Sequence, residues 1–500
     1  MDRIRSDHEL AANLDRGSGL VRLDRQLGLR TLLLGVLLLW PLILFGGPGC
    51  IADSAAYIKG GKVAVAFVTD RFEPASQPAT APIGPAGKAD EVADPRAAAA
   101  SAKGVRSIAY SVLAYAFRGP GFTMTWLAVF QIVVAAFTCA VVATASGVRS
   151  WKRYAILCLV LAGASSLPTF ASFALPDVFA GIVAACQILL FTCFEKLSRA
   201  VRVALVAIAS VAVAVHASIA PLAFWLCVAG SVFVIWQRRH LISPIARLAG
   251  LWAPMLIGGA ATVAAGFIAF GETSVVAKHY PHALARSVAD GPARWYLEKE
   301  CVRPRYAVCE VFGTRIPSTV SGFLFNDTGL DGRATPEQMD RIRAEERQIV
   351  LRAAMTYPAT EFGNLADHVV RQAVLFGRLP SRFGDYVHSD ASGNAEFVEM
   401  PDKNSLALST LNLFTYPAIW LCFLWVAINF RRLDREQQIA LGLILSVLIV
   451  NAGFCVLASG VSDRYQARLA WIVPLFVLAY AFSRERIHLR FPAKSAIPAY

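Results

Sequence analysis

The sequence predicts an all-α, polytopic membrane protein with about ten transmembrane helices. Of its 500 residues, 56% are hydrophobic and only 17% are charged, whereas soluble domains usually carry about 25% charged residues. Apolar runs of roughly 20 residues, the length that crosses a bilayer, recur along the chain. They are continuous, unlike the short alternating segments that build a transmembrane β-barrel. Two long polar segments interrupt them, so we expect a helical bundle with two large outer segments.

The apolar runs define the expected spans in chain order. The first, "TLLLGVLLLWPLILF", begins at Thr31. The polar tail before it is too long for the charged end of a cleaved signal peptide, so it predicts an uncleaved anchor. The ten expected spans are 31–47, 122–145, 154–172, 177–195, 201–216, 218–236, 248–271, 406–430, 437–458 and 469–483.

The net charge of +13 follows the expected topology. Basic residues concentrate in turns on one side of the bundle, such as "VRSWKR" and "FRRLDRE", whereas the short turns on the other side hold only Arg464 and Arg468. This is the positive-inside bias, which places both termini in the cytoplasm. The charge therefore predicts a multi-pass protein of the bacterial inner (plasma) membrane and not a nucleic-acid partner.

These spans divide the chain into five parts. We expect a cytoplasmic tail (1–30), a transmembrane module with an outer loop at 48–121 (31–271), a periplasmic domain (272–405), C-terminal transmembrane helices (406–483) and a cytoplasmic tail (484–500). The middle of the outer loop is rich in Pro, Ala and Gly and predicts a mobile segment. The apolar stretch Val105 to Phe117 is too short to span and predicts a helix that lies at the membrane surface or packs on the bundle.

The second outer segment carries the signals of a small helical domain. Thr335, Pro336 and Gln338 form a helix start with a capping box. The apolar residues that follow share one face of a helix; they are Met339, Ile342, Ile349, Val350 and Ala353. Cys301 and Cys309 lie in the same segment, where a periplasmic location permits a disulfide. Their spacing leaves both a disulfide and two free thiols open.

Several polar residues fall on the outer face of the expected topology. Asp53 follows the first span, Asp177 and His216 lie at two outer turns, and a third outer turn contains Arg464, Tyr465 and Arg468. Polar groups near the hydrocarbon need partners or water, so their convergence predicts a polar cavity at the membrane surface. Each residue also has a structural explanation: helix capping for the aspartates, a hydrogen-bonded helix end for His216, and snorkelling for the arginines.

Two short motifs carry a family resemblance. The stretch "DSAAYI" after the first span, with Asp53 and Tyr57, resembles the first outer loop of the GT-C class of integral-membrane glycosyltransferases. Relatives in that class include protein O-mannosyltransferases and the aminoarabinose transferase of lipid A. "RSIAYSVL", with Arg106 and Tyr110, resembles a second motif of the class but lacks its prolines. "LPDVFAG", with Asp177, resembles the second acidic turn.

The resemblance covers roughly residues 31–240. It departs from the O-mannosyltransferases because Ser54 replaces the second residue of their acidic pair. The resemblance implies transfer of a sugar from a polyprenyl-phosphate donor to a glycan, lipid or protein acceptor on the periplasmic face. The sugar, the acceptor and any dependence on a metal stay open.

Roles for the polar residues follow from that reaction. Asp53 is the candidate general base, which takes the proton of the acceptor hydroxyl. Arg464, Arg468 and Arg106 are candidates to neutralise the leaving phosphate. The remaining candidate substrate-binding residues are Tyr57, Tyr110, Asp177, His216 and Tyr465. The sequence has no cluster with metal-ligand spacing; no cofactor is firmly predicted, and a divalent metal stays open.

Three other functions compete with this interpretation. A polysaccharide polymerase, or another enzyme of lipid-linked glycans, also has about ten spans and outer arginines. A transporter places charged groups near the bilayer midplane and often contains inverted repeats, whereas these spans have few central charges and no visible repeat. A non-catalytic membrane component with a partner-binding outer domain is the third alternative. Neither sugar nor oligomeric state follows from the sequence.

Overall fold

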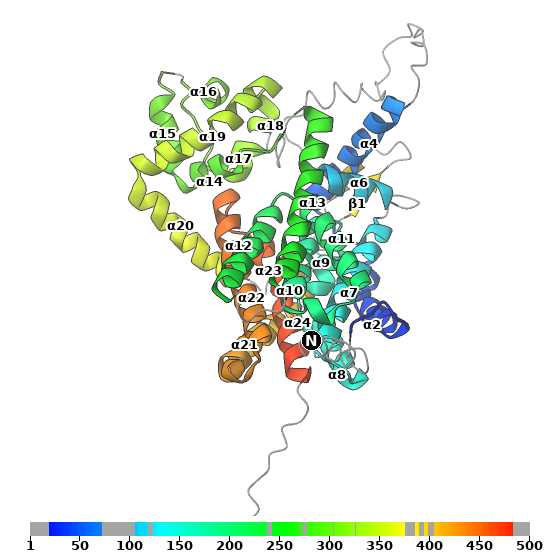
Figure 1. Ribbon diagram of the computed structural model, residues 1–500. Coiled ribbons are helices and arrows are strands. Elements are labelled where there is room, and N and C mark those ends of the chain that lie inside the picture. Colours follow the sequence, from blue (N-terminus) through cyan, green and yellow to red (C-terminus); the bar gives the residue numbers. More distant parts are fainter. Residues whose placement is uncertain are drawn as a thin grey trace, which may run out of the picture.

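Helices dominate the computed structural model, as the apolar runs predict (Figure 1). The structure describes residues 20–72, 106–118, 124–237, 243–271, 273, 278–303, 305–325, 327–375, 386–389, 395–398 and 405–483. The predicted mobile segment, the predicted tail 484–500 and most of the predicted tail 1–30 lie outside the described residues. An antiparallel hairpin of β1 (Tyr386–Ser389) and β2 (Ala395–Val398) is an addition to the expected all-α fold.

Six helices in the described part of the chain are long and apolar enough to cross a membrane, which confirms a multi-span membrane protein but not the predicted count of ten. Three further predicted spans are shorter, among them 218–236, where the apolar helix covers Ala220–Trp236. Helix α10 (Phe179–Thr192) has 14 residues and α11 (Arg199–Val215) has 17. At a rise of 1.5 Å per residue they extend about 21–26 Å, less than a hydrocarbon layer of about 30 Å. The six segments are Arg25–Phe45, Thr125–Ala145, Pro244–Phe270, Thr410–Arg432, Arg435–Ala458 and Asp463–Ser483.

The predicted span 154–172 is divided into two helices. Helix α8 (Trp151–Ala164) ends where Ser165 becomes extended, and α9 (Leu167–Ser172) begins with Pro168 in its first turn. Proline has no amide hydrogen to donate to the preceding turn, so it favours a helix start over a helix interior. The Ser165 hydroxyl accepts a hydrogen bond from the amide of Leu167 (3.2 Å) and stabilises the break.

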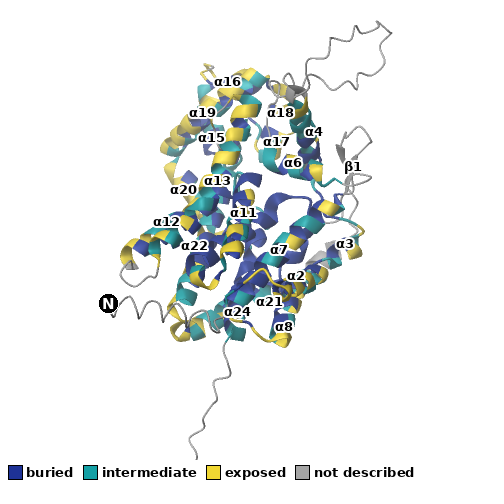
Figure 2. Ribbon diagram, turned by 45° about the vertical axis from the view of Figure 1, so that its right-hand side comes forward, coloured by how far each residue is buried: buried dark blue, intermediate teal, exposed yellow. Residues whose placement is uncertain are grey.

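Helix α10 is the centre of the bundle. All of its residues are buried, as expected for a helix that is apolar on every side. It packs against α7 (Thr125–Ala145), α11, α12 (Ala220–Gln237), α13 (Pro244–Phe270) and α22 (Arg435–Ala458). Figure 2 shows the buried residues concentrated in the interior of the bundle, among α7, α11 and α22. The helices that surround α10 therefore hold their outer ends in fixed positions relative to one another.

A backbone contact joins the first outer loop to the turn before α10. Gly49 and Phe173 form a parallel bridge, and the amide of Ala174 donates to the Gly49 carbonyl (2.8 Å). Position 49 favours glycine, because a Cβ there would lie only 3.0 Å from the Phe173 ring. The Ser54 hydroxyl adds a bond to the Ala174 carbonyl (3.0 Å). This contact brings the start of α4 beside the turn that contains Asp177.

The first outer segment begins as a long helix. Helices α2 (Arg25–Leu37) and α3 (Trp40–Phe45) are followed by α4 (Ala52–Phe72), which packs against α6 (Ile108–Ala116). A Cβ on Gly61 would clash with the Ser111 carbonyl, so glycine allows the two helices to approach closely. Helix α6 confirms the short helix expected over 105–117. The pairing of α4 with α6 brings the residues before α6 next to Asp53.

The predicted outer turn at 459–468 is partly helical. Helix α23 (Asp463–Ala470) carries Arg464, Tyr465 and Arg468, and α24 (Ile472–Ser483) continues it. Asn451 of α22 fixes this start, because its side-chain amide donates to the Tyr465 carbonyl (2.7 Å). The turn prediction missed the helix because its polar residues resembled a loop, although α23 is amphipathic.

Residues 278–375, called the outer domain below, form a second helical unit with its own hydrophobic core. Its helices are α14 (His282–Asp290), α15 (Pro292–Glu300), α16 (Ala307–Phe312), α17 (Val320–Leu324), α18 (Leu330–Arg333), α19 (Pro336–Thr356) and α20 (Pro358–Ala373). The predicted capping box at the start of α19 is present. In Figure 1 the outer domain lies at one end of the bundle, and α20 connects the two.

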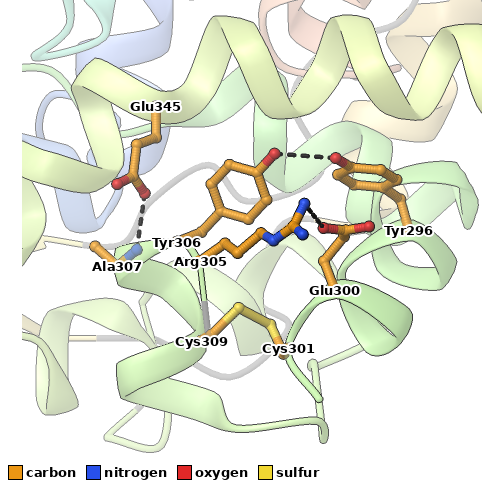
Figure 3. Close-up of a disulfide and its surroundings, with 8 residues drawn as sticks. All are labelled: Tyr296, Glu300, Cys301, Arg305, Tyr306, Ala307, Cys309 and Glu345. Carbon is orange, nitrogen blue, oxygen red and sulfur yellow. Dashed lines mark hydrogen bonds and ion pairs between the residues drawn. A yellow bond between two sulfur atoms is a disulfide. The ribbon is translucent and has the colours of Figure 1, made fainter. Parts of the chain in front are cut away.

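A disulfide joins Cys301 to Cys309 across the loop between α15 and α16 (Figure 3). The hydroxyls of Tyr296 and Tyr306 are hydrogen-bonded beside it (2.9 Å). The Glu345 carboxylate accepts a hydrogen bond from the amide of Ala307 (2.8 Å) and so connects α16 to α19.

One further helix of the bundle, α21 (Ser405–Asn429), follows the outer domain and the hairpin in the chain.

Candidate functional site

A cavity of about 930 Å³ lies between the bundle and the outer domain. We call its bundle side the floor and its outer-domain side the roof. The floor carries eight of the nine candidate residues: Asp53, Tyr57, Arg106, Asp177, His216, Arg464, Tyr465 and Arg468. The roof carries His279, Tyr280, His282, Phe325 and Glu346. Apolar residues of α12 and α13, among them Phe224, Met255 and Phe270, line the rest of the wall.

Asp53 lies between two guanidinium groups. Its Oδ1 accepts a hydrogen bond from Arg106 (2.6 Å), and its Oδ2 is 3.6 Å from a terminal nitrogen of Arg464. The three side chains are 22–28% exposed, so they remain accessible from the cavity. Asp53 lies inside the first turn of α4 and not before it. Asp53 is therefore not the N-cap residue of α4, and its two ion-pair partners come from outside that helix.

Arg468 and Asp177 form a buried pair at the bottom of the floor. A terminal nitrogen of Arg468 is 3.4 Å from Oδ1 of Asp177, and the two side chains are only 2% and 5% exposed. Arg468 also donates to Oδ1 of Asn451 (3.2 Å). This burial excludes snorkelling of Arg468 to water. Asp177 makes no capping hydrogen bond to α10, whose N-cap is Val178.

Neutral polar groups complete the floor. His216 ends α11, and its Nδ1 accepts a hydrogen bond from the amide of Ser218 (3.1 Å). The Tyr465 hydroxyl is hydrogen-bonded to the Ser459 hydroxyl (2.8 Å). The guanidinium groups of Arg464 and Arg468 both lie 5.6 Å from the centre of the Tyr465 ring. Cation–π attraction therefore helps to hold the two arginines beside each other.

The structure separates Tyr110 from the predicted set of substrate-binding residues. Tyr110 is fully buried and does not line the cavity. Its ring packs edge-on against Tyr57 (4.7 Å between centroids), and its hydroxyl donates to Gln131 (2.9 Å). Burial raises the pKa of the Tyr57 hydroxyl, which stays neutral. Tyr110 thus packs behind Tyr57 and does not face the cavity. The motif resemblance could not show which face of α6 points inward, so the prediction for Tyr110 differs from the structure.

The roof residues were not among the candidates. Tyr280 donates its hydroxyl to Asp331 (3.0 Å), and the guanidinium of Arg106 lies 5.7 Å from its ring. Glu346 accepts from the amide of Leu284 (3.0 Å) and lies 3.2 Å from Nε2 of His279. The run "HYPH" at 279–282, soon after an expected span end, was a usable signal for these residues.

The charges of the floor favour an anionic ligand. In the floor, three guanidinium groups face two carboxylates, which leaves one positive charge in excess there, whereas Glu346 in the roof balances it over the whole cavity. Nε of Arg468 is buried and has no hydrogen-bond partner among the described residues. Arginine suits bidentate contact with phosphate. Within the described part of the chain no group of His, Cys, Asp and Glu is arranged to hold a metal ion.

Comparison of the chain with protein-family models, with curated proteins and with solved structures finds no match.

Proposed function

We propose that this protein is a membrane glycosyltransferase that moves a sugar from a polyprenyl-phosphate donor to an acceptor on the periplasmic face. The observation that carries the proposal is the convergence of Asp53, Arg106 and Arg464 in one cavity beside the buried Arg468–Asp177 pair. The donor tail partitions into the bilayer, so its phosphate stays at the interface. A cavity at the outer ends of the helices suits such a donor.

Asp53 is the proposed general base. Arg106 occupies one carboxylate oxygen at 2.6 Å, whereas Arg464 approaches the other only to 3.6 Å. The second oxygen keeps a lone pair for the acceptor hydroxyl. That hydroxyl oxygen forms a bond to the anomeric carbon of the donor sugar while its proton passes to Asp53. The bond from the anomeric carbon to the phosphate oxygen breaks, and its electron pair leaves with the polyprenyl phosphate.

The arginines have two proposed roles. Arg464 stabilises the negative charge that develops on the leaving phosphate, since it is partly exposed to the cavity and only loosely paired (3.6 Å). Arg468 supplies positive charge from below, and Asp177 and Asn451 hold it in place. Preorganised donors of this kind stabilise a transition state without reorganisation.

The position of the polar groups favours this reaction over transport. They gather at the helix ends beneath the outer domain, whereas transporters place such groups near the bilayer midplane. The polymerase alternative shares the arginines but makes no demand on Asp53. Asp53 therefore separates the two enzyme classes.

Asp53→Asn tests the proposal. First, mass analysis of surface glycans and lipid-linked sugars, with and without the protein, identifies the donor and acceptor. Transfer by the purified protein is then measured in vesicles. We expect the variant to lose about 10²–10⁴-fold in turnover, the usual contribution of a positioned base. Its abundance and membrane insertion should not change.

Asp367→Asn is the matched control, because Asp367 lies on α20 with a half-exposed side chain away from the cavity. Normal turnover in both variants would remove Asp53 as the base. Substrate uptake into vesicles without a covalent product would instead support a transporter.

A further inference from the structure

The roof of the cavity contains an aromatic cluster that the proposed reaction does not yet use. The ring of Tyr280 lies 5.2 Å from that of Phe325, and the His282 ring lies 6.1 Å from both. Phe325 is 40% exposed although it is a large apolar residue at the edge of a packed domain. Its exposed surface lines the cavity. A hydrophobic ring is thus presented to a site whose floor is charged.

Neighbouring bonds hold this cluster in position. The hydroxyl of Tyr280 is engaged by Asp331 (3.0 Å), and α14 begins at His282. Glu346 of α19 binds the amide of Leu284, two residues further on (3.0 Å). These hydrogen bonds and the start of α14 hold the three rings in position.

One polar atom in the cluster lacks a partner. Nδ1 of His282 is buried and makes no hydrogen bond within the described residues. A buried polar group without a partner is unfavourable, so it is a place where a ligand hydroxyl gains a hydrogen bond. Burial and the nearby Arg106 lower the pKa of His282 to about 4. The ring is neutral at pH 7 and has one nitrogen that accepts and one that donates.

Aromatic faces beside neutral hydrogen-bonding groups match a pyranose ring. One face of such a ring presents C–H groups, which carry partial positive charge and suit the negative face of an aromatic ring. Its rim presents hydroxyls, which suit His282. A phosphate fits this surface poorly, because Glu346 is the formally charged roof residue and phosphate prefers the arginines of the floor.

We propose that Tyr280, His282 and Phe325 form a binding subsite for a pyranose ring. The subsite deepens the proposed glycosyl transfer and rests on it for its biological role. The ring belongs either to the donor, as the sugar being transferred, or to a carbohydrate acceptor. In both cases the roof holds the sugar while the floor holds the phosphate.

Saturation-transfer NMR tests the subsite without catalysis. The protein in lipid nanodiscs is mixed with the methyl glycosides of glucose, galactose and mannose, one at a time, and with mannitol, which has hydroxyls but no ring. We expect transfer to the C–H protons of at least one glycoside and none to mannitol. Phe325→Leu keeps an apolar side chain but removes the aromatic face, and should weaken binding about three- to tenfold.

Two variants sharpen this result. His282→Phe keeps a ring and removes both nitrogens, and should weaken binding to a similar degree. Phe362→Leu makes the same substitution at a residue of α20 that is 63% exposed and does not line the cavity, so it should bind as the wild type does. Absence of transfer to every glycoside, or equal binding by wild type, Phe325→Leu and His282→Phe, would overturn the subsite.

Competition identifies the source of the ring. A polyprenyl-phosphate sugar displaces the bound glycoside if the subsite holds the donor sugar, whereas an acceptor subsite keeps its glycoside and both ligands bind together. Saturation transfer reports binding of the glycoside and needs no turnover. The subsite therefore survives or fails independently of the role of Asp53 in catalysis.

Discussion

Arg468 and Asp177 are charged residues with almost no access to water that form an ion pair, and Arg464 adds to the electrostatic attraction on Asp177. The guanidinium of Arg468 donates two further hydrogen bonds, to Asn451 and to the sulfur of Cys455 (3.5 Å). Neither carries a negative charge. Removal of one partner from a buried ion pair typically costs about 3–5 kcal/mol, because the other charge is left uncompensated.

We therefore expect Asp177→Ala to lower the free energy of unfolding by about 3–5 kcal/mol, measured by denaturation in mixed micelles. The double variant Asp177→Leu with Arg468→Met should recover much of this loss, since it removes both charges. Asp367→Ala, at a half-exposed residue of α20, should change stability by less than about 0.5 kcal/mol. Equal stability of the two single variants would contradict the buried pair.

The shifted pKa of His282 makes the folding stability of the protein depend on pH. Its pKa is lowered to about 4 by burial and by Arg106, against the opposing effects of Glu346 and Asp53. In the unfolded chain its pKa is near 6.5. Between these values the unfolded chain binds a proton that the folded protein does not, so folding stability falls as the pH drops from about 6.5 to about 4.

The measurement compares denaturation midpoints of the wild type and His282→Phe at several pH values. Below pH 6.5 the denaturation midpoint of the variant should fall less steeply with acid than that of the wild type. Above pH 6.5 the two curves of midpoint against pH should be parallel. Parallel curves through the acid range would show that His282 titrates as it does in the unfolded chain.

Among single residues, the sequence predicted the floor of the cavity better than the roof. The floor residues follow apolar spans, so hydropathy alone assigns them to one face. Phe325 and Glu346 lie inside the outer domain, and their approach to Asp53 depends on how that domain packs on the bundle. A single sequence contains no direct signal for such packing.

At the scale of elements, one side chain links α20 to the start of α23. Gln372 is fully buried, donates to the Ser462 carbonyl (3.0 Å) and accepts from the Ser462 amide (2.8 Å). Arg464 lies two residues further on. The outer domain is thus hydrogen-bonded to the segment that positions a floor arginine.

Gln372→Ala should lower stability by about 1–3 kcal/mol, since it leaves two backbone groups without partners. It should also reduce transfer less than Asp53→Asn does, because Arg464 is displaced but remains present. Thermal unfolding and turnover are measured together. The control is Arg371→Ala, which removes an exposed i,i+4 ion pair with Asp367 on the same helix and should have little effect on either quantity.

The boundaries of elements could be predicted where local chemistry decides them. The capping box of Thr335 and Gln338 fixes the start of α19 from four residues alone. By contrast, the sequence predicts a turn where α23 lies, because the contacts of α23 with Asn451 come from another helix. The sequence also predicts one continuous span over 154–172, although that span contains Pro168. Hydropathy outweighed the local signal there.

At the scale of the whole molecule, the polar groups form two separate ends. Segments expected on the cytoplasmic side contact one another: Arg30 donates to the Arg149 carbonyl (3.1 Å), and Arg247 binds both Glu195 (2.8 Å) and Glu436 (3.1 Å). Asp53, Asp177 and the outer domain gather elsewhere, around the cavity. The predicted division into two faces therefore agrees with the contacts, whereas its orientation in the membrane rests on the positive-inside rule.

Thiol labelling in intact cells tests that orientation. All eight free cysteines are buried, so an exposed cysteine introduced by mutation reacts with little background. Val302 of the outer domain is 72% exposed, and Lys152 is exposed in the first turn of α8. We expect a membrane-impermeant maleimide to label Val302→Cys in intact cells, and Lys152→Cys only after permeabilisation. The reverse pattern would place the cavity on the cytoplasmic side, where a periplasmic acceptor could not reach Asp53. Labelling of both in intact cells would contradict the two-ended arrangement itself.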